Sequence, residues 1–184
     1  MNKTDTAQFI QNTHHSLIQY LGSLDEYSFL LSANGKWSAA EQLDHLIKSV
    51  SPVNQALSLP NFLLKLMFGK ANRPSKSYEE LVEKYQGKLL AGGKAPKAFT
   101  PKKITFQQRD TILNKLEQLA LAVSKKATQY TEDELDTLIL PHPLLGKLTL
   151  REMLYFTGYH CTHHQNLIAV AIEEYEKNNS KTIH

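Results

Sequence analysis

The chain has little of several things: one cysteine and one tryptophan among 184 residues, and no long apolar run. A single cysteine, Cys161, cannot form an intramolecular disulfide, so we expect a reducing, cytoplasmic setting. The longest apolar stretch, residues 62–68, is too short to cross a bilayer and contains a lysine. The polar first six residues do not resemble a signal peptide. Together these absences predict a soluble protein without a membrane partner.

An excess of one sign of charge is also largely missing, because the formal net charge is only +3. The basic excess is local: residues 70–103 hold nine Lys or Arg against three Glu. This segment lacks interleaved aromatic residues that could stack on bases, so we expect no nucleic-acid partner. A basic, irregular segment is more typical of a solvated surface, with attraction of an anionic group as the alternative.

No segment keeps the period-two alternation of a strand for long. Apolar residues instead recur at helical spacing in four segments, near residues 5–24, 38–51, 105–130 and 149–175. Ser38 with Glu41, and Thr149 with Glu152, match capping boxes at two of the helix starts. The pattern predicts an all-α fold, a four-helix bundle formed by one domain over residues 1–176, followed by a polar tail, 177–184.

A long irregular connection separates the second and third of these helices. Pro52 should kink or break the second helix, and Pro60 should open a separate short helix over Asn61–Phe68. A further short helix is expected from Ser77 to Leu90. Because glycines and prolines punctuate the rest, residues 70–103 are predicted to form a surface excursion and not a fifth core helix. Residues 140–147, with two prolines, are predicted to be a turn-rich loop.

The spacing of the histidines indicates a candidate metal site. His160 and His164 are four residues apart, so on a helix both imidazoles leave the same face and can reach one ion. His45, in the second apolar helical segment, is the best candidate for a third ligand. Three neutral imidazoles leave coordination positions open, which is typical of catalytic and not structural zinc.

Several alternatives stay open at this level. His163 could replace His164 in an i, i+3 arrangement with the same partner. Glu41 either closes the first turn of its helix or orients His45 through the second ring nitrogen. Trp37 either staples the preceding loop to the core or covers the open side of the metal site. Interior histidines that are satisfied by ordinary hydrogen bonds remain the alternative to a metal site.

The other histidines and the cysteine have plainer interpretations. His14 and His15 straddle two faces of the first helix, so we expect both to be partly exposed. His142 lies between two prolines, which suggests a position at the surface or at the edge of a substrate site. Cys161 points away from His160 by about 100° of helical arc, so it is expected to be a small packing residue and not a ligand or nucleophile.

Three short segments of the chain form recognisable motifs. Residues 37–46 read W-S-x-x-E-x-x-x-H-L, residues 142–149 read H-P-x-x-G-x-L-T, and residues 159–165 read Y-H-C-T-H-H-Q. These segments resemble motifs of the DinB-like superfamily, the last being similar to its H-x-x-H-H-x-x-Q stretch. Their order and spacing are similar to those of the family from the first helix to about Tyr175.

The resemblance implies a four-helix bundle with a divalent metal (zinc, nickel or iron) held by His45, His160 and His164. It further implies a metal-dependent enzyme that activates water or a low-molecular-weight thiol, acting as a hydrolase or S-transferase on a small-molecule substrate. The alternative is a non-catalytic metal- or ligand-binding bundle that acts as a homodimeric scaffold.

Overall fold

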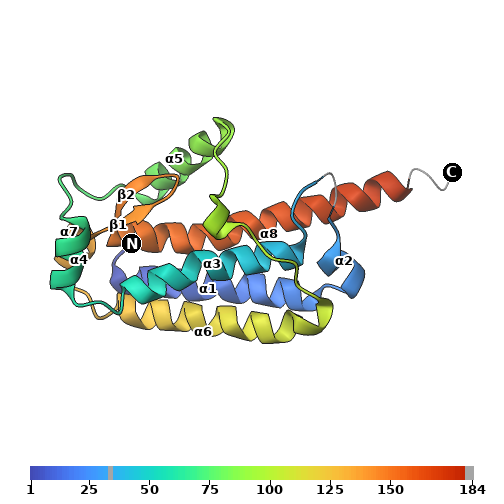
Figure 1. Cartoon of the computed structure of the whole chain (residues 1–184), viewed down its shortest axis with the longest axis horizontal. Helices are drawn as coiled ribbons and strands as arrows, with labels where there is room; N and C mark the ends of the chain where they lie inside the picture. The colour runs from blue at the N-terminus through green and yellow to red at the C-terminus, as the bar shows by residue number, and fades with distance from the viewer. Residues whose placement is uncertain (33–34, 181–184) are drawn as a thin grey trace.

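Four long helices lie side by side in the computed structural model, which describes residues 1–32 and 35–180 (Figure 1). They are α1 (Lys3–Ser23), α3 (Ala39–Ala56), α6 (Arg109–Ala127) and α8 (Leu150–Ser180). Helices α1 and α3 each pack against both α6 and α8. The prediction of an all-α protein is confirmed in that the described chain is mostly helical. Among the described residues, no helix is both long enough and apolar enough to cross a membrane.

Shorter elements connect the long helices. They are α2 (Glu26–Leu30), α4 (Asn61–Phe68), α5 (Tyr78–Leu90), η1 (Lys97–Phe99), η2 (Phe106–Gln108), α7 (Glu132–Thr137), β1 (Ile139–His142) and β2 (Gly146–Thr149). The two strands pair antiparallel, with His142 opposite Gly146. The turn-rich loop predicted here is therefore a small hairpin, and Gly146 closes it with a positive φ of 79° that favours glycine.

The predicted helix starts are confirmed by their caps. Ser38 Oγ accepts from the Glu41 backbone N–H at 3.2 Å, and Glu41 returns a carboxylate oxygen to the Ser38 N–H at 2.9 Å. Thr149 and Glu152 repeat this exchange at the start of α8. A break at Pro52 is wrong, because α3 continues through it to Ala56. Val50 and Val53 bury apolar side chains on either side of the proline, which offsets the lost backbone hydrogen bond.

The connection between α3 and α6 is only partly a surface excursion. Residues 91–103 are mostly exposed, as predicted. Helix α5, however, packs against α8 and buries Leu81 and Tyr85 there (Figure 1). The reason is that Leu81 and Tyr85 lie one turn apart on the same face of α5. Helix α5 therefore lies against the part of α8 that carries His160.

The far end of α8 departs from the predicted pattern. The helix continues to Ser180, so the polar stretch from Lys177 begins inside it, while residues 181–184 lie outside the described part of the chain. Leu167 is 44% exposed, and its neighbour Ile168 is buried. Figure 1 shows this end of α8 extending past the other long helices, so few neighbours cover it.

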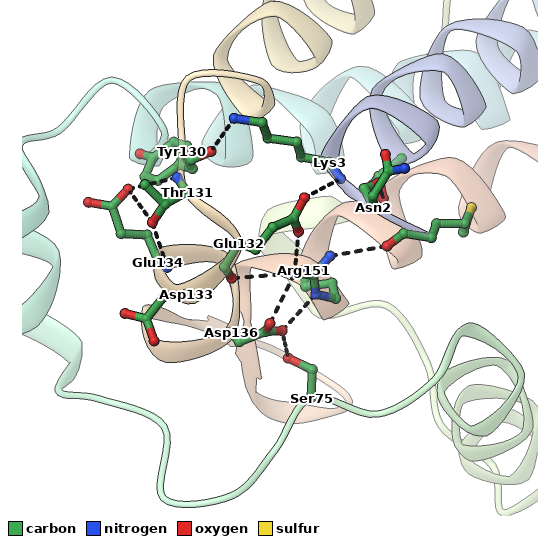
Figure 2. Close-up of polar contacts among 12 residues, drawn as sticks. Asn2, Lys3, Ser75, Tyr130, Thr131, Glu132, Asp133, Glu134, Asp136 and Arg151 are labelled. Atoms are coloured by element: carbon green, nitrogen blue, oxygen red, sulfur yellow. Dashed lines mark hydrogen bonds and ion pairs between the residues drawn. The ribbon is translucent and has the colours of Figure 1, made fainter.

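A polar network fixes the opposite end of α8 (Figure 2). Arg151 donates to Glu132 at 2.6 Å and to Asp136 at 2.6 Å, both of them on α7. Glu132 also accepts the backbone N–H of Lys3 at 3.0 Å. Ser75, in the α4–α5 connection, donates to Asp136 at 2.5 Å. These contacts tie α1, α7 and the α4–α5 connection to the first turn of α8, the helix that carries His160 and His164.

Candidate metal centre

Three buried histidines from two helices meet at one point. His45 comes from α3, and His160 and His164 come from successive turns of one face of α8. His160 Nε2 lies 3.3 Å from His45 Nε2 and 3.0 Å from His164 Nε2. One ligand atom from each of the three lies within 4.8 Å of the others. We call these residues the histidine cluster.

The outward-facing nitrogens of two rings are held by hydrogen bonds. His45 Nδ1 lies 2.8 Å from the carbonyl oxygen of Phe99, so it must carry the proton and donate it. Gln42 donates its amide N–H to the carbonyl of Trp37 at 3.1 Å, which turns its oxygen toward His164. His164 Nδ1 therefore donates to Gln42 Oε1, at 2.7 Å. A neutral ring protonated at Nδ1 presents a lone pair at Nε2.

Ordinary hydrogen bonding does not satisfy this arrangement. The Nε2 lone pairs of His45 and His164 both face His160 Nε2, which can carry at most one hydrogen and so can satisfy only one of them. A cation among the three lone pairs satisfies all of them. Nitrogens bound tetrahedrally at about 2.0–2.1 Å would lie about 3.3 Å apart, close to the two separations observed. The donor set and its spacing fit a divalent metal such as zinc.

The electrostatics keep the cluster uncharged. Burial lowers the pKa of His160 and of His164 well below 6.5, and the neighbouring imidazoles add to the effect. Burial also lowers the pKa of His45, against an opposing contribution from its bond to Phe99. Neutral imidazole is the form that binds metals, so no proton has to leave these rings at neutral pH.

A pocket of about 120 Å³ reaches the cluster and is lined by both His45 and His160. We call it the histidine pocket. Its walls come from α3, α5, the residues around η1, the β1–β2 hairpin and α8, and they are largely apolar, including Val50, Val53, Leu89, Leu144, Met153 and Phe156. An apolar pocket with a few polar groups at one end is typical of a small-molecule site.

The structure separates the alternatives for residues beside the cluster. His163 stacks on Tyr159 and meets Tyr85 edge-on, so His164 and not His163 joins His45 and His160. Glu41 is occupied by its helix cap, and the carbonyl of Phe99 orients His45 in its place.

Trp37 and Cys161 also take definite places. The ring of Trp37 lies 5.1 Å from that of His45, so it covers one side of the cluster. Cys161 is fully buried, and burial raises the pKa of its thiol, as expected of a packing residue.

The positions of His14 and His142 can be compared with those predicted from the sequence. The prediction that His14 is partly exposed is wrong: it is 1% exposed between α1 and α6, with Nδ1 bonded to the Ile10 carbonyl at 2.8 Å. His15, the next residue, is exposed. His142 lines the histidine pocket, and its position at the edge of a substrate site stays a prediction.

Sequence reasoning missed three residues of this site. Gln42 lies one turn before His45 on α3, a spacing that could have drawn attention to it. Phe99 acts through its backbone carbonyl, for which a side-chain pattern carries no signal. Tyr85 lines the pocket from the segment predicted to be a surface excursion.

Comparison with known proteins agrees with this architecture. The family model of the DinB superfamily matches residues 8–168, which include the whole of α3 and α6, most of α1 and α8, and the whole histidine cluster. The chain therefore belongs to the DinB superfamily. No curated protein sequence matches it.

Proposed function

We propose that this chain is a metal-dependent hydrolase or thiol S-transferase that acts on a small, largely apolar substrate. His45, His160 and His164 would hold one divalent ion within a four-helix bundle of α1, α3, α6 and α8. An ion held by three neutral imidazoles supplies open coordination positions and lowers the pKa of a bound water or thiol. The observation that carries the proposal is the meeting of three Nε2 atoms beside the apolar histidine pocket.

The side chains around the pocket favour a nucleophile from outside the protein. Ser49 Oγ donates to the His45 carbonyl at 2.9 Å, and Thr157 Oγ1 donates to the Met153 carbonyl at 2.8 Å. Both hydroxyls are therefore engaged by their own helices. Cys161 is buried and its thiol pKa is raised, so it holds its proton. A water molecule or a small thiol remains as the nucleophile.

The surrounding residues orient the ligand rings and limit access of water. Phe99 and Gln42 keep the lone pairs of His45 and His164 directed inward. Phe156 stacks on His160, with ring centroids 4.8 Å apart, and Trp37 covers His45. Such apolar cover strengthens electrostatic interactions at the cluster by lowering the local dielectric.

The test combines metal analysis with paired activity assays. Purified protein should contain about one divalent ion per chain, and chelation should remove it. Ester hydrolysis and transfer of cysteine or glutathione to chlorodinitrobenzene are then measured with zinc-, nickel- and iron-loaded protein. Activity that is lost on chelation and restored by one metal supports the proposal. A protein that binds an ion but turns over neither class of substrate would instead be a non-catalytic metal-binding bundle.

A further inference from the structure

His142 presents one defined polar edge. It ends β1, and its Nδ1 accepts hydrogen bonds from the backbone N–H groups of Leu144 and Leu145 at 3.1 and 3.0 Å. A nitrogen that accepts two N–H groups carries no hydrogen of its own. Burial, with Lys84 nearby, lowers the pKa of His142 to about 4, so the ring is neutral at pH 7. Its one hydrogen is therefore on Nε2, on the side of the ring away from the hairpin turn.

This tautomer is the opposite of that in the histidine cluster. His45 and His164 are protonated at Nδ1 and offer lone pairs, whereas His142 offers an N–H. Among the described residues, no acceptor is bonded to His142 Nε2. The ring meets Phe156 edge-on at 4.3 Å, and Phe156 stacks on His160, so the donor belongs to the wall of the histidine pocket next to the cluster.

Tyr85 supplies a second donor on the same wall. It is 6% exposed, and its hydroxyl has no hydrogen-bond partner within the part of the chain that the structure describes. Within the described ranges, no carboxylate lines the pocket, whereas Lys94 does. Unpaired donors without a nearby anion suit a ligand with oxygen acceptors and disfavour a cationic one.

We propose that His142 is a specificity-determining residue whose Nε2–H binds a carbonyl-type oxygen of a small, otherwise apolar ligand in the histidine pocket. This inference rests on the proposed function for its catalytic meaning, since the held oxygen would lie beside the metal ligands. The volume of about 120 Å³ suits a ligand of about one ring. A dry cavity of about 150 Å³ is known to take benzene.

The test uses the full chain labelled with ¹⁵N-histidine, in zinc-loaded and chelator-treated forms. Long-range ¹H–¹⁵N spectra report the tautomer of each ring, and we expect His142 to be protonated at Nε2. Acetophenone and ethylbenzene are then titrated as probes with and without a carbonyl. Acetophenone should bind about five- to tenfold more tightly than ethylbenzene, the difference expected of one net hydrogen bond, and should shift the Nε2 resonance.

Two variants separate the donor from the fold. His142→Asn keeps an acceptor near the position of Nδ1 for the hairpin turn but removes the Nε2–H, so it should remove most of the preference while the protein stays folded. Tyr85→Phe removes only a hydroxyl and should reduce the preference less. An Nδ1–H tautomer at His142, or an unchanged preference in His142→Asn, overturns the inference.

The two protein forms distinguish this inference from the proposed function. If none of zinc, nickel and iron binds but the chelator-treated protein prefers acetophenone through His142, the role of His142 stands and the proposed function fails. If zinc binds and drives turnover while His142→Asn leaves the preference intact, the proposed function stands and the role of His142 is wrong.

Discussion

Gln42 determines the tautomer of His164. The amide of Gln42 is held at both ends: its N–H group donates to the Trp37 carbonyl and its oxygen accepts from His164 Nδ1 at 2.7 Å. The bond to the Trp37 carbonyl fixes which end of the amide is the N–H group. The amide oxygen therefore faces His164, and it can only accept a hydrogen bond from His164 Nδ1. The Nε2 lone pair of His164 is thereby directed at His160. One glutamine on α3 thus determines which nitrogen of a histidine on α8 carries the lone pair.

Replacing Gln42 should therefore weaken metal binding without removing a ligand. We expect Gln42→Leu to lower zinc affinity about 10- to 100-fold, the usual effect of losing a group that orients a ligand. Gln42→Glu keeps an acceptor for His164 Nδ1 and should retain more affinity than Gln42→Leu. Competition with a chromophoric chelator measures both. Gln118→Leu, at an exposed position of α6, is the control, and equal affinities for all variants would contradict the role of Gln42.

His160 and His163 should respond differently to the same substitution. His160 Nε2 is the atom that both other histidines of the cluster approach, so we expect His160→Ala to reduce bound metal from about one ion per chain to well below half. His163 stacks on Tyr159 outside the cluster, and His163→Ala should leave metal content unchanged. Elemental analysis after dialysis checks both. Loss of metal from His163→Ala alone would move the ligand assignment to His163.

Removing the metal should leave the protein folded. Leu17, Leu43, Leu116 and Leu154 belong to one buried apolar core to which all four long helices contribute. Chelation should preserve the helical circular dichroism spectrum and lower the melting temperature by several degrees. An ion at 100 times its dissociation constant adds about 2.7 kcal/mol, and about 2–4 °C per kcal/mol is typical at this chain length. Collapse to an unfolded chain would mean that the ion is structural.

His14 should make stability depend on pH. Burial lowers its pKa from 6.5 to about 4, against an opposing contribution from its bond to the Ile10 carbonyl. Since the folded-state pKa lies below the unfolded one, the unfolded chain takes up the proton first as pH falls from about 6.5 to 4. Stability therefore decreases across that window, by about 3 kcal/mol for a shift of this size. The other buried histidines contribute with the same sign.

His14→Leu isolates this contribution. The variant removes the titrating ring and also Nε2, which has no partner among the described residues. Urea unfolding of metal-free protein at pH 7 and pH 4.5 should show a smaller loss of stability for His14→Leu than for the unaltered chain. His15→Leu changes the exposed neighbour on the same helix and should leave the loss unchanged. Identical losses in all three proteins would show that His14 titrates normally.

The sequence alone was enough for the features that depend on local geometry. Helical periodicity and capping residues act within a few positions of one another, so the starts of α3 and α8 followed from Ser38 and Thr149. Spacing by four placed His160 and His164 on one face for the same reason. The resemblance to the DinB-like superfamily, which the family match confirms, rested on short segments of this kind.

Only the tertiary structure decided the chemistry of each ring. The tautomer of His164 depends on Gln42, 122 residues away, and that of His45 on a backbone carbonyl 54 residues away. The burial of His14 depends on which face of α1 meets α6. The apolar spacing of α1 is compatible with more than one such face, so the sequence did not determine it. Local pattern determines which side chains share a face. Hydrogen-bond partners and burial arise only when distant segments pack together, and they set which nitrogen carries a proton and which can bind an ion.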